Sequence, residues 1–394
     1  MTGRLAFTLL VLVAVLSIDG AAQQKPRARD LGIPFEGTPG PNNAITDVAG
    51  VEVGHTTLIS GDGPLRVGIG PVRTGVTAVL PRGKTSSDPA FAAWFSINGN
   101  GEMTGTTWIE EGGLLEGPIF ITNTHSVGTV RDAAVLWAVE RKKLVQPWAM
   151  PVVAETYDGG LNDINGFHVK KDHVFAALDG ASSGRVAEGN VGGGTGMSCY
   201  GFKCGIGTAS RHLDAGAGGY TVGVLVQANH GGPLRIAGVP ISTEIRSPNV
   251  PPPLAPPALP GDERLELGSI IIVIATDAPM MPHQLKRLAH RASHGLGRTG
   301  ATSGNGSGDI AIAFSTANPG AAAAPDVAQV GMVSNRRISA LFTATVEGVE
   351  EAIVNALIAA ETMTGANNRT VTAISHDRLR EVLQKYNRLV PVKR

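Results

Sequence analysis

The sequence predicts an α+β fold in which sheets and helices form layers. Short runs of β-branched residues are separated by glycine and aspartate, helical spacings occur between and after them, and no segment repeats at a fixed period. Because strands and helices do not alternate strictly, a Rossmann fold or a TIM barrel matches less well. With 394 residues the chain can bury a large core, either as one unit or as two or three domains.

The composition argues against polyanionic partners. The chain has 33 basic and 33 acidic residues and a formal net charge of zero, so it lacks the basic excess that attracts nucleic acid or anionic lipid. Its 52 glycines, with only 5% aromatic residues, indicate many tight turns in a compact globular protein. We therefore expect no nucleic acid and no membrane as partners.

The first residues have the pattern of a secretory signal. Arg4 precedes an apolar run, Leu5–Ile18, which ends in the small residues Gly20-Ala21-Ala22. We predict a signal peptide over residues 1–22 and export to a periplasm or out of the cell. In such an oxidising compartment Cys199 and Cys204 can close a small disulfide loop, although two buried thiols fit the spacing equally well.

The first half of the mature chain is predicted to be rich in strands. The polar, proline-containing segment 23–40 is interpreted as a loosely held arm. The region from Ile45 to Leu80 has strand and hairpin patterns, and helical spacing follows at 129–142. The strand patterns are at Val51–Gly54, Val67–Ile69, Pro151–Ala154 and Tyr220–Val226, the last with alternating sides.

A proline-rich stretch separates the two halves of the chain. Seven of the thirteen residues from Pro248 to Pro260 are proline, which excludes a helix or a central strand and predicts an exposed linker. The apolar run from Gly268 to Ile274 follows, and it is typical of a strand buried on both faces. Further elements are predicted as a helix at 282–296, a strand at 309–315, a helix at 346–363 ended by Gly365, and a last helix capped by Ser375.

Several short motifs match known functional patterns only in part. Ser182 lies in a G-x-S-x-G pattern, but the residues after it lead into the glycines of 192–196 instead of a helix. Those glycines fail the dinucleotide fingerprint and indicate a flexible or ligand-lining loop, and Gly83-Lys84-Thr85 is an ordinary turn. His283, His290 and His294 share one helix face with basic neighbours, so we predict a solvated surface, no metal and no cofactor.

One set of segments, taken together, resembles the L-aminopeptidase/D-esterase and β-peptidyl aminopeptidase family. The resemblance extends from about Ile33 to Glu381, and the segments occur in the family's order. It implies an αββα sandwich resembling N-terminal nucleophile hydrolases, self-cleavage of a precursor into two chains, and homo-oligomers of the two-chain unit. The segments are Val153-Ala154-Glu155-Thr156-Tyr157, Val226-Gln227-Ala228-Asn229, Gly268-Ser269-Ile270-Ile271, Ala275-Thr276-Asp277-Ala278-Pro279 and Asn305-Gly306-Ser307-Gly308-Asp309.

The resemblance also implies a role for each matching residue. Cleavage between Gly268 and Ser269 would divide the mature chain into 23–268 and 269–394, which form one structural domain. Ser269 is the implied nucleophile, and Glu155 is implied to bind the ammonium group of the substrate. Ser307 and Asp309 are the implied hydrogen-bonding partners of Ser269, and Asn229 and Tyr157 the implied oxyanion stabilisers. Asp309 departs from the family, because the β-peptidyl members carry glutamate there.

The chemistry of a cut before Ser269 supports this interpretation. A serine hydroxyl needs a base, and the freed α-amino group, with an ordinary pKa of about 7.7 to 8.0, can accept its proton. Gly268 leaves the carbonyl that is attacked uncrowded. Glu155, two residues before Tyr157 on the same strand edge, would bind a free amino terminus and restrict attack to the first residue.

The expected function is that of a self-activated serine aminopeptidase. It would release N-terminal residues from small peptides, amides or esters through an acyl-enzyme on Ser269. One alternative is an acyl transferase like ornithine acetyltransferase, although that class typically cleaves before threonine. Another is an exported binding protein that keeps the fold without catalysis. The sequence leaves the preference for L-amino acids, D-esters or β-peptides open.

Overall fold

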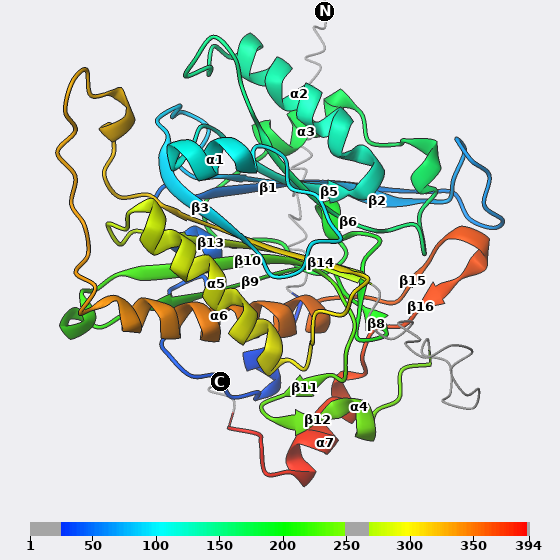
Figure 1. Ribbon diagram of the computed structural model, residues 1–394. Helices are drawn as coiled ribbons and strands as arrows, with labels where there is room; N and C mark the ends of the chain where they lie inside the picture. Colours follow the sequence, from blue (N-terminus) through cyan, green and yellow to red (C-terminus); the bar gives the residue numbers. More distant parts are fainter. Residues whose placement is uncertain (1–24, 249–267, 392–394) are drawn as a thin grey trace, which may run out of the picture.

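Two β-sheets lie face to face, and helices cover both outer surfaces (Figure 1). The computed structural model describes residues 25–248 and 268–391. The predicted signal peptide, 1–22, and the predicted linker beyond Pro248 lie outside these residues. Within the described residues, no helix combines the length and the apolar character needed to cross a membrane.

The first sheet has four strands in the order β1-β2-β5-β6 and is covered by helices α2 and α3. The second has six strands in the order β4-β3-β14-β13-β10-β9 and is covered by α5 and α6. The predicted αββα sandwich is therefore confirmed.

The bounds of the first sheet and its helices are Glu52–Ser60 (β1), Val72–Leu80 (β2), Ile119–Asn123 (β5), Val152–Thr156 (β6), Val127–Glu140 (α2) and Lys171–Asp179 (α3). Those of the second are Leu114–Leu115 (β4), Ala90–Ser96 (β3), Ser307–Ser315 (β14), Gly268–Thr276 (β13), Thr221–Asn229 (β10), Ile206–His212 (β9), Pro282–Arg298 (α5) and Ile338–Ile358 (α6).

Short elements complete the fold around this sandwich. The helices are Thr106–Gly112 (α1), Ile241–Glu244 (α4) and His376–Lys385 (α7), and the 3-10 turns include Ala28–Leu31 (η1) and Gly192–Gly194 (η5). Three two-stranded hairpins are Ser198–Cys199 with Phe202–Lys203 (β7, β8), Arg235–Ile236 with Val239–Pro240 (β11, β12), and Met363–Thr364 with Thr370–Val371 (β15, β16).

Strand β13 shows how the sequence produces the layers. Ile271, Val273 and Ala275 pack between the two sheets, whereas Ile270 and its alternate neighbours pack against the helices. Because side chains alternate along a strand, Ser269 belongs to the side that faces the other sheet. Burial on both faces explains the unbroken apolar run, and β10, for which the sequence predicted alternating sides, is likewise buried on both faces.

Most of the predicted elements in the second half are present, but both ends of one helix were predicted wrongly. Helix α5, strand β14 and helix α7 lie where they were expected, and the hydroxyl of Ser375 accepts from the amide of Arg378 at 3.3 Å. Helix α6 begins earlier than predicted, at Ile338, and stops at Ile358 instead of continuing to Gly365. Gly365 does not cap it, because that glycine packs against the carbonyl of Leu161, where a Cβ would come within 2.1 Å of the oxygen.

In the first half, several strand assignments were incomplete. Val67 and Ile69 are 64% and 71% exposed in the loop between β1 and β2, so the strand predicted there is wrong. Strands β3, β5 and β9 and helix α3 were not predicted. The glycine-rich segment is also not flexible: Gly192–Gly194 are buried, and a Cβ on Gly193 would lie 2.2 Å from the side-chain oxygen of Gln227.

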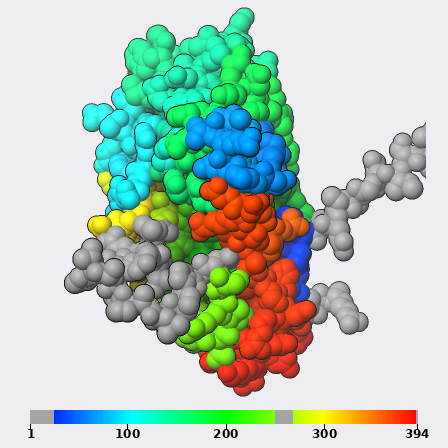
Figure 2. Space-filling model, turned by 90° about the vertical axis from the view of Figure 1, so that its right-hand side faces the viewer, coloured from blue at the N-terminus to red at the C-terminus, as the bar shows by residue number. Residues whose placement is uncertain are grey.

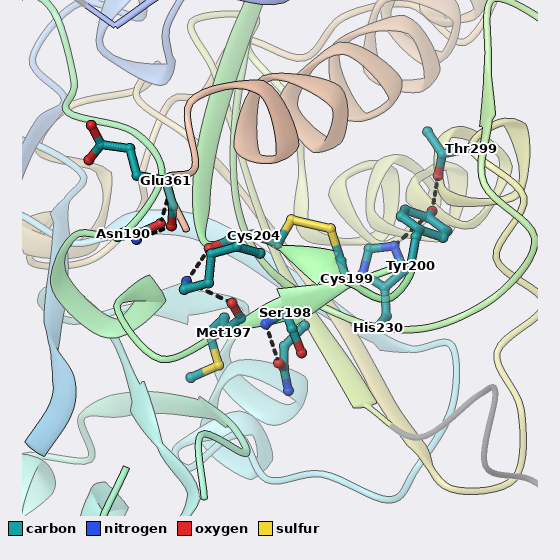
Figure 3. The surroundings of a disulfide bond; sticks show 11 residues. Asn190, Met197, Ser198, Cys199, Tyr200, Cys204, His230, Thr299 and Glu361 are labelled. Atoms are coloured by element: carbon teal, nitrogen blue, oxygen red, sulfur yellow. Dashed lines mark hydrogen bonds between the residues drawn. A yellow bond between two sulfur atoms is a disulfide. The ribbon is translucent and has the colours of Figure 1, made fainter. Parts of the chain in front are cut away.

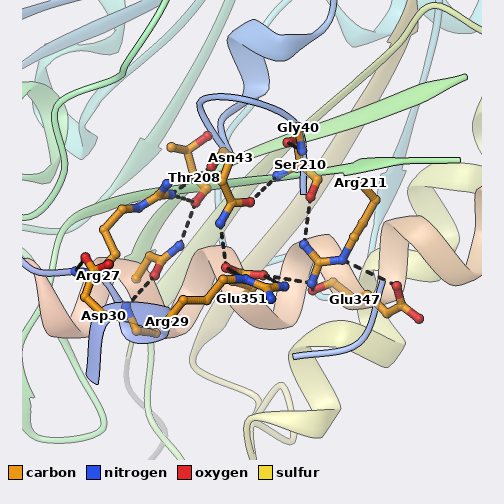
Figure 4. Close-up of polar contacts among 12 residues, drawn as sticks. Arg27, Arg29, Asp30, Gly40, Asn43, Thr208, Ser210, Arg211, Glu347 and Glu351 are labelled. Carbon is orange, nitrogen blue, oxygen red and sulfur yellow. Dashed lines mark hydrogen bonds and ion pairs between the residues drawn. The ribbon is translucent and has the colours of Figure 1, made fainter. Parts of the chain in front are cut away.

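The segment expected to be a loose arm is anchored by buried charges (Figure 4). The guanidinium of Arg27 lies 2.7 Å from the Glu188 carboxylate, and that of Arg29 lies 2.8 Å from Glu351 on α6. Arg211 of β9 binds the same Glu351 at 2.8 Å. Although burial opposes ionisation, the hydrogen bond from Arg29 and the charge of Arg211 keep the pKa of Glu351 below its usual value. The prediction failed because the partners of these arginines are distant in sequence.

The weaker motifs behave as ordinary structure. Ser182 is exposed and forms an isolated bridge with Val53, and no helix follows it. Within the two described ranges, no three histidine, cysteine or acidic side chains are grouped as a metal would require.

Candidate active site

Three neighbouring strands bring the candidate nucleophile and its partners to one end of the larger sheet. Strand β13 pairs antiparallel with β10 and parallel with β14, so that Ser269 stands opposite Asn229 on one side and Gly308 on the other. Residues that are 38 to 40 positions apart in sequence thus become neighbours through strand register. The backbone is continuous from Gly268 to Ser269, so this is the geometry of the uncut chain.

Ser269 is nearly buried, with 6% of its surface exposed, and it lines a cavity. Its hydroxyl oxygen accepts from the amide of Gly308 at 3.2 Å. Gly268 has a φ of 145°, and a Cβ built there would come within 2.0 Å of the carbonyl oxygen of Asn229. Only glycine fits before Ser269, since any side chain would collide with the neighbouring strand.

Ser307 and Asp309 are close to Ser269, but they contact its neighbour. The Ser307 hydroxyl donates to Oδ1 of Asp309 at 2.5 Å, and the amide of Ile270 donates to the same oxygen at 3.2 Å. Both residues are buried. The carboxylate therefore lies against the backbone one residue beyond Ser269, and no hydrogen bond joins it to Ser269 itself among the described residues.

Asn229 is held in one orientation. Its side-chain oxygen accepts from the amide of Ser198 at 2.9 Å, and its side-chain nitrogen donates to the carbonyl of Tyr157, also at 2.9 Å. An amide nitrogen carries two hydrogens, so one remains for a ligand in the cavity. The side chain is thus oriented before any substrate arrives.

The spacing between Glu155 and Tyr157 had suggested that both residues lie on one strand, but Tyr157 does not. Strand β6 ends at Thr156, and Tyr157 is 55% exposed in the following loop. Its ring lies over Gly159, where a Cβ would come within 2.3 Å of the phenol oxygen. The hydroxyl makes no hydrogen bond with any residue that the structure describes, and the contact with Asn229 is made by the backbone carbonyl.

Glu155 is the next-to-last residue of β6 and is 4% exposed. One carboxylate oxygen accepts from the amide of Glu102 at 3.1 Å and the other from the hydroxyl of Thr124. Burial raises the pKa of Glu155 above its ordinary value, and these two hydrogen bonds only partly oppose the rise. A buried carboxylate that borders a cavity is suited to bind a cation.

The cavity joins these residues in a volume of about 440 Å³, within the size range of small-ligand sites. Glu155, Tyr157, Asn229, Gly268 and Ser269 all border it, whereas Ser307 and Asp309 lie behind the wall. The prediction of a ligand-lining glycine loop is partly confirmed, because Gly196 is in the wall. Gly306, from one of the segments that carry the family resemblance, also borders the cavity. The wall residues that the sequence did not indicate are Asn100, Thr124, Gly160, Leu161, Ser198, Arg369 and Val371.

A disulfide supports the wall from behind (Figure 3). Cys199 and Cys204 are bonded, with 5.4 Å between their Cα atoms, which settles the alternative that the spacing had left open. Ser198, which holds Asn229, directly precedes Cys199, and the closed loop contains Tyr200. Lys203 in the same loop is buried and donates to the carbonyls of Met197 and Cys204, each at 2.7 Å.

Tyr200 connects this loop to the residue that follows Asn229. Its hydroxyl lies 2.9 Å from Nε2 of His230 and 2.5 Å from the hydroxyl of Thr299. Burial lowers the pKa of His230 to about 4, although the charge of nearby Asp309 opposes this. His230 is therefore neutral at ordinary pH and serves as a packed, hydrogen-bonded support and not as a cation.

Comparisons with known proteins agree with this geometry. Residues 43–371 match Peptidase family S58. The chain is 54% identical to a β-peptidyl aminopeptidase, BapA, of Sphingosinicella microcystinivorans, over 97% of this chain and 98% of that protein.

Two solved structures share the fold. One is the β-aminopeptidase of a Burkholderia species, with 50% identity and a TM-score of 0.82 over 91% of this chain and 99% of that chain. The other is the L-aminopeptidase D-Ala-esterase/amidase of Ochrobactrum anthropi, described as a prototype of the serine aminopeptidases and a new variant of the Ntn hydrolase fold. It is 51% identical, with a TM-score of 0.84, over 93% of this chain and 100% of that chain.

These similarities support the predicted family, fold and enzyme class, and they lend no support to the transferase alternative. The chain belongs to Peptidase family S58 and is a serine aminopeptidase with an Ntn-hydrolase type of fold.

Proposed function

We propose that this aminopeptidase is made as a precursor, cuts itself between Gly268 and Ser269, and then uses the new N-terminal Ser269 as its nucleophile. One observation carries the proposal: Ser269 borders the cavity opposite Asn229, directly after a glycine whose position admits no side chain. The same cavity holds a buried carboxylate, Glu155.

In the precursor, the Ser269 hydroxyl oxygen attacks the carbonyl carbon of Gly268. The peptide C–N bond breaks as an ester forms, and the proton lost by the hydroxyl ends on the freed amine. Water then hydrolyses the ester, which gives a carboxylate at Gly268 and restores the hydroxyl of Ser269. The products would be 23–268, of 268 − 22 = 246 residues, and 269–394, of 394 − 268 = 126 residues.

In the mature enzyme, the amine of Ser269 accepts the proton of its own hydroxyl as that oxygen attacks the substrate. With an ordinary pKa of about 7.7 to 8.0, a useful fraction of this amine is neutral near pH 7. The free N–H of Asn229 would donate to the oxyanion, and Tyr157 would add its hydroxyl if the ring turns away from Gly159. Asp309 and Ser307, beside the amide of Ile270, would fix the strand that carries the amine.

Glu155 makes the enzyme an aminopeptidase. A substrate ammonium group bound to this carboxylate places the first peptide bond at Ser269 and excludes internal bonds, whose nitrogen carries no charge. Substrates are thus small peptides, amides or esters with a free amino terminus. The relatives' names point to β-peptides and to L-amino acid or D-alanine derivatives, so both classes belong in the substrate panel.

Export and assembly are part of the same proposal. The signal pattern of residues 1–22 and the disulfide Cys199–Cys204 both fit a periplasmic or secreted protein, because disulfides persist in oxidising compartments. Exposed apolar side chains near the end of α2, including Trp148 at 54% and Val139 at 51%, fit a contact in a homo-oligomer.

The decisive variant is Ser269→Ala, assayed with amino-acid p-nitroanilides and no acyl acceptor. We expect hydrolysis to fall on the order of 10⁴-fold or more, as for loss of a nucleophile in other serine hydrolases. Ser182→Ala is the matched control, since Ser182 is the exposed serine of the rejected motif, and it should keep full activity. Activity retained in Ser269→Ala, or strict dependence on an acyl acceptor in the wild type, would refute the proposal.

A further inference from the structure

Arg369 supplies the positive charge in the wall of the cavity. Among the described residues that border it, Glu155 has the only carboxylate and Arg369 the only basic side chain. Arg369 follows η9 (Ala366–Asn368) and immediately precedes β16. Its backbone closes the hairpin, with the amide of Gly365 donating to its carbonyl at 2.9 Å.

The hairpin that carries Arg369 is firmly docked. Leu161, Met363 and Val371 form a small apolar cluster, and the amide of Ala366 donates to the carbonyl of Leu161 at 2.8 Å. In Figure 2 the hairpin, in orange-red, lies against the blue loop between β1 and β2, and the side chain of Asn367 accepts there from the amide of Leu65 at 2.9 Å. The position of Arg369 is therefore fixed by its backbone, while its side chain stays exposed.

The guanidinium has room at the cavity and no internal partner. It lies beside Gly160, where a Cβ would come within 3.4 Å of its Nη1 atom. With the residues that the structure describes, the guanidinium forms neither an ion pair nor a hydrogen bond. An arginine left unpaired at a binding cavity is available for an anionic group of a ligand.

We propose that Arg369 binds the terminal carboxylate of a short peptide substrate, on the leaving-group side of the bond that is cut. This assignment rests on the proposed roles of Ser269 and Glu155. Once Glu155 holds the ammonium group and Ser269 faces the first carbonyl, the rest of the peptide meets the remaining wall. That wall includes Gly160, Leu161, Arg369 and Val371, and Arg369 is its one basic side chain among the described residues. The two opposite charges of the cavity then match the two charged ends of a dipeptide or tripeptide.

The test compares one dipeptide that the wild type cleaves with the same dipeptide carrying a C-terminal amide. In Arg369→Met, which keeps an apolar stem without the charge, the ratio of kcat/KM for acid over amide should fall about tenfold, as expected for one charge-assisted hydrogen bond. Arg369→Lys should restore part of that ratio, and 0.5 M salt should lower the ratio in the wild type.

Arg336→Met is the matched control, because Arg336 is also exposed but does not border the cavity, and its acid-to-amide ratio should equal that of the wild type. A ratio unchanged in Arg369→Met, or equal losses on acid and amide, would refute the assignment. A different result would show that Ser269 is not the nucleophile. In that case Ser269→Ala would keep activity on both substrates, whatever the ratio in the Arg369 variants.

Discussion

The two walls of the cavity are built in opposite ways. The strand wall contains Ser269, Asn229 and Gly268, which lie in paired strands, with 6% and 7% of the surface of Ser269 and Asn229 exposed. The loop wall contains Tyr157, 55% exposed after the end of β6, and the exposed Arg369 in the turn of the β15–β16 hairpin. The nucleophile and the Asn229 donor thus have one rigid geometry, while Tyr157 and Arg369 lie on loops, where variation costs little. Changes in the strand wall should therefore reduce all reactions alike, and changes at Arg369 should alter the choice among substrates.

Among changes in the strand wall that leave Ser269 in place, loss of the Asn229 donor should reduce activity most. We expect Asn229→Ala to lower kcat by about 100- to 1,000-fold, the usual cost of removing one oxyanion donor. The reduction should be similar for peptides, amides and esters, as steady-state kinetics on all three would reveal. Asn229→Asp keeps the acceptor for the Ser198 amide but lacks the N–H. If this variant recovers most of the activity, the side chain acts only as a support.

A side chain before the scissile bond should slow self-cleavage. The Cβ of Gly268→Ala would collide with the Asn229 carbonyl, and the displaced carbonyl carbon should slow the cut by about 100-fold. Gly99→Ala is the control, because a Cβ there meets no atom within 4 Å. The rate is measured by electrophoresis of the precursor after a pulse of synthesis. Equal rates in the two variants would show that the close approach at Gly268 is unimportant.

Glu155→Gln should weaken the binding of amino termini, with an increase in KM of about tenfold at neutral pH. In the wild type, KM should rise on the acid side as the carboxylate protonates, at a pH above the ordinary range of glutamate because burial raises its pKa. This rise of KM at acid pH should be absent in Glu155→Gln. If the rise is unchanged in the variant, another group is responsible for the titration.

The same shift makes a prediction about stability. The pKa of Glu155 is higher in the folded state than in the unfolded state, so ionisation of this carboxyl lowers the free energy of unfolding. The loss occurs as the pH rises through the folded-state pKa. Glu155→Gln should therefore be more stable than the wild type at neutral pH, and the difference should shrink below pH 4, as urea unfolding at both pH values would detect. A difference that does not depend on pH would contradict the assigned cause.

The smallest expected effect on activity comes from the disulfide behind the strand wall. Reduction, or Cys199→Ala with Cys204→Ala, should lower the free energy of unfolding by about 2 kcal/mol, because the closed loop is short. Activity should fall only a few-fold, because the contact between the Ser198 amide and Asn229 becomes looser. A melting temperature that is insensitive to reductant would show that the loop is held by Lys203 and Tyr200 alone.

The sequence predicted the strand wall better than the loop wall, and the reason is physical. A run such as Ile270–Ile274 is typical of a doubly buried strand, and pairing with the neighbouring strands then brings distant residues together. Arg369, Thr124 and Asn100 come from loops and strand ends whose positions depend on tertiary contacts, so no local pattern marks them. The anchored segment around Arg27 was missed for the same reason, since its stability comes from Glu188 and not from its own composition.

Our account depends on a free amine at Ser269. The most direct measurement is intact-mass analysis of the purified wild-type protein, combined with N-terminal sequencing of its smaller chain. We predict two chains and a smaller-chain sequence that begins Ser-Ile-Ile-Ile, at position 269. A single unbroken chain in fully active protein, or a smaller chain that begins at any other residue, would contradict it.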